Sequence, residues 1–177
     1  MADATLQTGQ QSDVASRALT IAQALAHAST RERAETRRMG DEGAPFFWRM
    51  PARLGLRPDE ERAWLVFTRM AALLTPSTAT ATFHDRNRPL GAVLADGGAP
   101  GGRLEQPVVS EARLARLLAA RGDLRLSALE RAVRAICRET RALDAASLAW
   151  AVINPDGRQI ARDYYRRLDG GAPVTKD

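Results

Sequence analysis

The sequence predicts an all-α protein, and three observations support that prediction. Apolar residues recur at helical spacing along most of the 177 residues. Residue types that start and stop helices stand at the ends of those apolar stretches. No segment alternates apolar and polar residues with the period of two that marks a half-buried strand. We therefore expect about seven to nine helices, arranged as two small bundles joined by a linker rich in glycine and proline.

The first helix is expected over residues 13–28, because Val14, Ala18 and Leu25 recur on one helical face. Residues 1–12 are small and polar, and we expect them to fray. Residues 1–28 are thus predicted to be an N-terminal extension and a first helix. Ser29 and Glu32 then form a capping-box pattern, which starts a second helix over residues 31–39.

The aromatic and apolar segment at residues 44–56 is predicted to be a short helix or turn buried in the core. Pro58 and the three acids after it predict the start of a helix that runs to residue 74, because proline fits the first helical position and carboxylates suit the positive end of the helix dipole. Residues 75–88 are predicted to be a loop and residues 89–95 a brief helix. Together these elements make a predicted N-terminal helical half at residues 29–95.

A flexible linker is predicted at residues 96–109, since the run DGGAPGG cannot pack regularly. The C-terminal helical half is expected to cover residues 110–177. Its predicted helices span residues 110–121, 124–141, 145–152 and 156–168.

The composition excludes several classes of protein. One cysteine rules out a disulfide framework and a cysteine-rich zinc site, and two histidines leave little for metal binding or acid–base catalysis. No apolar run approaches the roughly 18 residues that a membrane span needs. The first residues lack the basic and apolar pattern of a signal peptide. We expect a cytoplasmic protein that is not an enzyme, binds no cofactor or metal and does not contact a membrane.

The basic charge is almost entirely arginine. Lys+Arg is 26 against 21 for Asp+Glu, and the only lysine is Lys176, which leaves 25 arginines. At residues 131, 134, 138 and 141 arginines form a stripe that points away from the apolar face of their helix. Further clusters lie at residues 31–38 and 158–167. Each cluster could be a solvated face with weak pairs such as Glu130–Arg134. Three clusters with few balancing acids favour contact with phosphates instead.

The order of several segments resembles a known family. APFFWRM at residues 44–50, RPLG at 88–91 and EARLARLL at 111–118 are followed by LDAASLAWAV and RQIARDYYRRL. This succession is similar to that of the CasB family, the small subunit of the type I-E CRISPR surveillance complex Cascade, over residues 30–169. The resemblance implies an all-helical, non-catalytic protein of two small bundled halves. Two copies would lie head-to-tail in the complex.

The resemblance also implies partners: the guide RNA, the target and non-target DNA strands, the large subunit and backbone subunits of Cascade, and a second copy of the chain. Basic helix faces would hold the displaced non-target strand and so stabilise the R-loop, whose formation is close to balanced in base-pairing energy. Matched motif by motif, the family's nucleic-acid contacts would fall on Arg38, Arg113, Arg131 and Arg158. With the charge clusters these give the candidate nucleic-acid-binding residues Arg33, Arg37, Arg38, Arg113, Arg116, Arg131, Arg134, Arg138 and Arg158.

Two other functions stay open from the residues alone. The basic faces would also suit a helical adaptor that binds acidic protein partners. A free-standing DNA-binding protein without sequence preference is the third possibility, although the sequence contains no convincing helix-turn-helix motif. Salt-dependent binding of a single nucleic-acid strand would distinguish a Cascade small subunit from an adaptor for acidic proteins.

Overall fold

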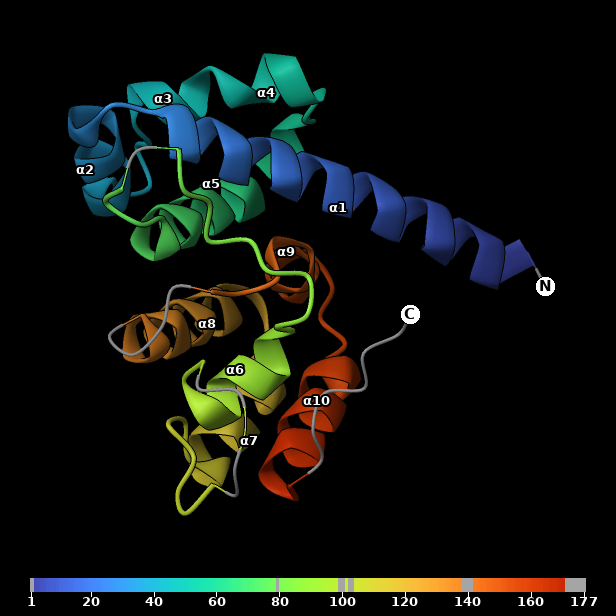
Figure 1. The fold of residues 1–177 in the computed structure, drawn as a ribbon. Coiled ribbons are helices and arrows are strands. Elements are labelled where there is room, and N and C mark those ends of the chain that lie inside the picture. Colours follow the sequence, from blue (N-terminus) through green and yellow to red (C-terminus); the bar gives the residue numbers. More distant parts are fainter. Residues whose placement is uncertain (1, 79, 99–100, 102–103, 138–141, 171–177) are drawn as a thin grey trace.

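The computed structural model describes residues 2–78, 80–98, 101, 104–137 and 142–170. Within these ranges the chain forms helices and their connections, with one isolated bridge between His84 and Leu143 (Figure 1). The all-α prediction is therefore confirmed. Counting two single-turn helices separately, these residues form ten helices: α1 (Ala2–His27), α2 (Thr30–Arg38), α3 (Pro45–Trp48), α4 (Met50–Leu54), α5 (Pro58–Leu74), α6 (Leu90–Asp96), α7 (Glu111–Ala119), α8 (Gly122–Ile136), α9 (Ala145–Ile153) and α10 (Arg158–Leu168).

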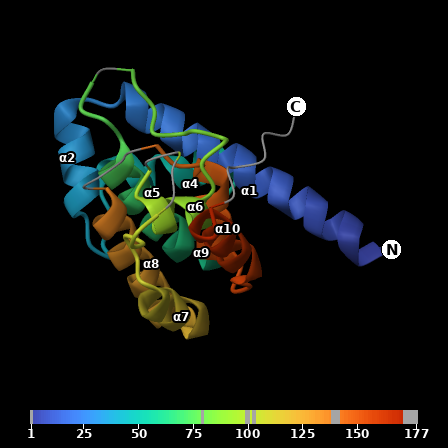
Figure 2. The ribbon, with the colours of Figure 1, turned by 60° about the horizontal axis from the view of Figure 1, so that its bottom comes forward.

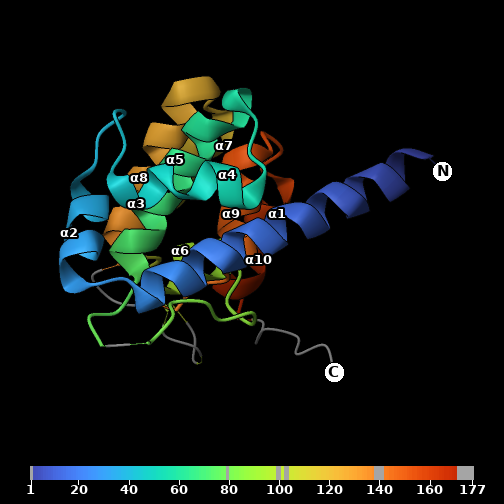
Figure 3. The ribbon, with the colours of Figure 1, turned by 90° about the horizontal axis from the view of Figure 1, so that it is seen from above.

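The longest helix, α1, begins earlier than the sequence predicts. It starts at Ala2, so the expected fraying of the first twelve residues is wrong for the part that the structure describes. Alanine, leucine and glutamine favour helix and recur in this stretch, which explains why the helix runs through it. Figures 1 and 3 show this end of α1 projecting beyond the other helices. Farther along, Val14, Ala18 and Ile21 are buried in the core, and α1 packs on α5 and α9.

The helix starts after α1 follow the local signals in the sequence. Ser29 accepts a hydrogen bond from the backbone N–H of Glu32 at 3.2 Å, and the Glu32 carboxylate accepts one from the N–H of Ser29 at 3.0 Å. This capping box confirms the predicted start of α2. α5 has the predicted bounds, with Pro58 at its first position and acids in its first turn. The single buried element predicted at residues 44–56 is divided into α3 and α4, which are separated by Arg49.

α6 packs closely against α10, although the two helices are about 70 residues apart in the sequence. Gly91 makes this approach possible, because a β-carbon there would collide with the carbonyl oxygen of Ile160 and lie 2.8 Å from the β-carbon of Asp163. Buried charges fix the same contact. Asp96 accepts hydrogen bonds from Arg88 and from Arg167, both at 2.6 Å. The division of the chain into an N-terminal and a C-terminal half remains a prediction.

The helices of the C-terminal part lie close to their predicted positions. α7 and α8 lie side by side at one edge of the molecule (Figure 2). Leu129, Val133 and Ile136 of α8 are fully buried, as their spacing predicts. α10 begins two residues later than expected, with Gly157 as its N-cap. Asp156 belongs to the turn before the helix, where its carboxylate accepts a hydrogen bond from the backbone N–H of Arg158 at 2.9 Å. No described helix has the length and apolar character needed to cross a membrane.

Candidate nucleic-acid interface

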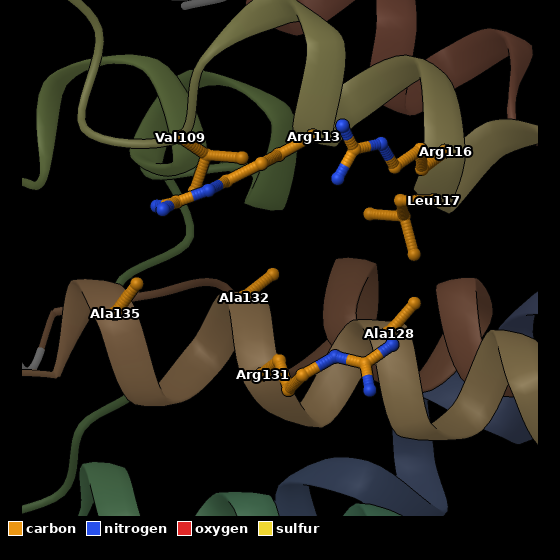
Figure 4. A pocket seen from close by; sticks show the side chains of 8 residues that line it. All are labelled: Val109, Arg113, Arg116, Leu117, Ala128, Arg131, Ala132 and Ala135. Atoms are coloured by element: carbon orange, nitrogen blue, oxygen red, sulfur yellow. The ribbon is translucent and has the colours of Figure 1, made fainter.

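A groove with a volume of about 370 Å³ runs between α7 and α8. Figure 4 shows Arg113 and Arg116 on the α7 side of this groove and Arg131 on the α8 side, with alanine side chains of α8 between them. We call this the α7/α8 groove. Its lining consists of Val109, Arg113, Arg116, Leu117, Ala128, Arg131, Ala132 and Ala135.

The helical repeat of α7 explains how its arginines reach the groove. Leu114 and Leu117 are buried and hold one face of α7 in the core. Arg113 and Arg116 are three residues apart, so they lie one above the other on a neighbouring, exposed face. The buried leucines therefore fix the direction in which these two arginines point.

On α8 the floor of the groove is made of small residues. Ala128, Ala132 and Ala135 follow one another at spacings of four and three residues, so they form a stripe along the helix. The short alanine side chains leave the space that the groove occupies. Arg131 is exposed at the side of this stripe. The prediction that Arg131 and Arg134 lie away from the buried face of α8 is confirmed.

The groove carries positive charge with no acid in its lining. Among the described residues, Arg113, Arg116 and Arg131 have no ion pair and no side-chain hydrogen bond. Three like charges around one concave surface repel one another and are stabilised by an anion between them. Because a guanidinium presents a planar fork of donors, it suits the oxygens of a phosphate or a carboxylate.

A buried arginine holds the helices next to the groove in place. Arg125, 3% exposed, donates hydrogen bonds to the carbonyl oxygens of Leu117 at 3.5 Å, Ala151 at 3.3 Å and Asn154 at 3.3 Å. These carbonyls lie at the ends of α7 and α9. Burial lowers the pKa of the Arg125 guanidinium from its ordinary value. Arg125 therefore has a packing role and is not part of the charged surface.

The arginines of α2 are divided between the interior and the surface. Arg33, 5% exposed, donates to the carbonyl oxygen of Pro76 at 2.8 Å and to that of Ser77 at 3.3 Å. Arg37 is partly buried and donates to the carbonyls of Ala72 at 2.7 Å and Thr75 at 2.9 Å. Both side chains thus satisfy carbonyl groups at and after the end of α5.

Arg38 is the exposed candidate residue of α2, and its Nε donates to a backbone carbonyl of its own helix at 3.2 Å. In Figure 1, α2 lies at the end of the molecule opposite α7. Arg38 is therefore on the surface, as predicted, but it is not part of the α7/α8 groove.

Two other candidate residues are exposed but paired with acids. Arg134 lies 2.7 Å from Glu130, which also binds Arg69 of α5 at 2.8 Å. Arg158 lies 2.7 Å from Asp156, and its hydrogen bond is the main reason that the pKa of Asp156 falls to about 2. Any phosphate that binds these two arginines must displace or share a carboxylate. Arg138 lies outside the described residues.

The described residues contain no group of three His, Cys, Asp or Glu side chains placed to hold a metal ion. His84 contacts the start of α9, where its Nδ1 accepts a hydrogen bond from the backbone N–H of Ala145 at 3.2 Å. The side chain of His84 is mostly buried against Asp144. The α7/α8 groove therefore offers anion binding through arginine donors.

Comparison with protein families gives one match. The family model described as CRISPR-associated protein Cse2 matches residues 24–165. This range covers the end of α1, all of α2 to α9 and most of α10, and it includes the whole lining of the α7/α8 groove. Neither a curated protein nor a solved structure matches the chain.

Proposed function

The chain belongs to the CRISPR-associated Cse2 family, the small subunits of type I-E Cascade, and from this premise we propose how it acts in the complex. It serves as a non-catalytic subunit that contacts guide RNA and target DNA through basic helix surfaces. Its α7/α8 groove holds the displaced non-target strand and so stabilises the R-loop. Arg38, Arg134 and Arg158 add weaker contacts from other parts of the surface.

One observation supports this proposal most strongly: three arginines from two helices face one groove, and no acid lines it. A charge that already has a partner gains little from a phosphate, whereas an unpaired guanidinium gains a charge-assisted hydrogen bond and releases a counterion. Forming an R-loop exchanges one duplex for another of similar stability. A few contacts to the displaced strand therefore shift that equilibrium.

We assign no nucleic-acid contact to Arg33 and Arg37 of α2, which are buried and partly buried. The guanidinium groups of Arg33 and Arg37 are engaged with carbonyl groups near the end of α5. We assign them to the stability of the α2–α5 packing. The proposed partners are those of a Cascade small subunit: the guide RNA, the DNA strands, the large and backbone subunits, and a second copy of the chain.

Replacing Arg113 and Arg131 together by alanine tests the proposal in a reconstituted complex. We expect slower and weaker R-loop formation, measured as protection of the target strand or reactivity of the displaced strand, with an unchanged melting temperature. A matched control replaces Arg53 and Arg86, which are exposed on α4 and between α5 and α6 and, like Arg113 and Arg131, have no ion pair among the described residues. It removes the same charge but should form R-loops normally.

An equal decrease of R-loop formation in both double variants would show a general effect of charge and would contradict the assignment to the α7/α8 groove. R-loop formation at the normal rate in the Arg113/Arg131 variant would refute the proposal. The adaptor alternative predicts a different result. An acidic polypeptide would then displace a nucleic acid from the chain more strongly than expected from its charge alone.

A further inference from the structure

We propose that the α7/α8 groove takes up one unstacked nucleotide of a single strand, with its base against the alanine floor and the neighbouring phosphates on the three arginines. This inference rests on the proposed function for the statement that the groove meets nucleic acid. It adds that the base, and not only the backbone, enters the protein.

The shape of the groove is the first reason. Phosphates need a charged surface, and a flat or convex helix face provides it without any cavity. Here the charges surround a hollow of about 370 Å³, which lies within the size range of small-ligand pockets. A backbone that only crossed the rim would leave this hollow filled with water.

The chemistry of the lining is the second reason. Apart from the three arginines, the lining residues are alanine, valine and leucine, without an amide, hydroxyl or carboxylate. Val109, Leu117 and Ala132 belong to the buried core, so the lining between the arginines is apolar on both the α7 and the α8 side. An apolar floor below a ring of cations matches a nucleotide, which has a flat base of low polarity on its faces and an anionic phosphate on each side.

The arrangement of the arginines is the third reason. Figure 4 shows Arg113 and Arg116 projecting from α7 and Arg131 lying along α8, so the guanidinium groups stand on both sides of the alanine stripe. Guanidinium planes stack on nucleobases, and no aromatic side chain is required for that contact. Two phosphates that flank a single inserted base can thus be bound from opposite sides of the groove.

The same geometry discriminates against a duplex. The bases of a duplex are stacked in its interior, so it can offer the groove only its backbone. The bases of a single strand can be turned outward into a pocket. The lining residues other than arginine have no side-chain hydrogen-bonding groups, so little sequence preference is expected.

Binding measurements with the full chain test the inference. The probes are a thymidine oligonucleotide of about ten nucleotides, an abasic strand of the same length and charge, and a duplex of that length. We expect the oligonucleotide to bind about fivefold more tightly than the abasic strand, the gain from covering roughly 40 Å² of one base with apolar side chains. The duplex should show no such gain. Equal affinity for the oligonucleotide and the abasic strand would overturn the inference.

Variants that fill the groove provide the second arm. Ala128→Leu and Ala135→Leu place a larger apolar side chain on the floor and leave every charge in place. Ala115→Leu makes the same change at an exposed position of α7 outside the lining. The floor variants should lose the fivefold preference and keep the affinity for the abasic strand, while the control variant keeps both. Retention of the preference in both floor variants would overturn the inference.

The Arg113→Ala and Arg131→Ala double variant separates this inference from the proposed function. Weaker binding of both strands by this variant supports the phosphate contacts, whatever the floor variants do. Unchanged binding of both strands would refute the proposed function at this groove and the inserted base with it.

Discussion

Removing Arg113 and Arg131 should change how strongly salt weakens the binding of a single strand. Both side chains are exposed and make no ion pair or side-chain hydrogen bond among the described residues. Each can therefore neutralise one phosphate without first leaving a carboxylate. Arg134 and Arg158 differ, because a phosphate must compete with Glu130 or Asp156 for them. The three arginines of the groove should accordingly dominate the salt dependence.

The magnitude follows from the number of unpaired guanidinium groups in the groove. Each phosphate neutralised on a single strand contributes about −0.7 to the slope of log K against log salt, so three contribute about −2.1. A fourfold rise in salt then weakens binding roughly 20-fold through the groove alone. With one arginine left, the contribution falls to about −0.7 and the same rise costs roughly threefold.

Fluorescence anisotropy with a labelled oligonucleotide, titrated at four or more salt concentrations, measures both slopes. The double variant must show the same cooperative thermal unfolding as the unchanged protein, so that lost binding is not lost folding. Equal slopes for both proteins would show that the groove neutralises no phosphates and would refute this prediction. A variant that binds less tightly at every salt concentration with an unchanged slope would refute it as well.

Three further predictions concern stability. Asp96→Asn leaves two buried arginines without their carboxylate, so we expect a loss of about 3–5 kcal/mol and a fall in Tm of roughly 10 °C; a fall below about 3 °C in calorimetry would contradict it. Arg125→Met removes a charged donor from three carbonyls at helix ends, so we expect the free energy of unfolding in urea to fall by about 2 kcal/mol, with partial recovery in Arg125→Lys. Stability equal to that of the unchanged protein would show that packing alone holds the ends of α7 and α9 against α8. The pKa of Asp156 is lowered to about 2 in the folded protein. The ionised carboxylate therefore contributes its full share to folding stability above its ordinary pKa of about 4, and this share is lost as the pH falls through about 2. Asp156→Asn should therefore reduce the Tm at neutral pH and have a much smaller effect near pH 2, and an equal effect at both pH values would contradict the assigned cause.

Much of the fold could be predicted because its signals are local. The Ser29–Glu32 capping box and the Pro58 start each depend on residues within one helical turn. The exposure of Arg131 follows from the helical repeat and the position of the leucines around it. These features need no knowledge of what packs on the other side of the helix.

The missed features depend on contacts between distant segments. Arg33 and Arg37 are bound by carbonyls about 40 residues later, so a count of charges along α2 could not separate them from Arg38. Arg125 was missed for the same reason, since its partners belong to α7 and to the end of α9. The groove could not be predicted either, because an alanine stripe has the same pattern whether it packs against a neighbouring helix or leaves a hollow. A long early helix was signalled only by residue propensities, which are weak.

The ends of the family match have a consequence for how the chain can be shortened. The match begins at residue 24, inside α1, and stops at residue 165, inside α10. Val14, Ala18 and Ile21 precede it and are part of the core, and Arg167 follows it and binds Asp96. A fragment trimmed to the matched region would lose these three core side chains and that of Ala22 at one end, and the buried guanidinium of Arg167 at the other. The region that matches the family is therefore shorter than the region that packs into the core.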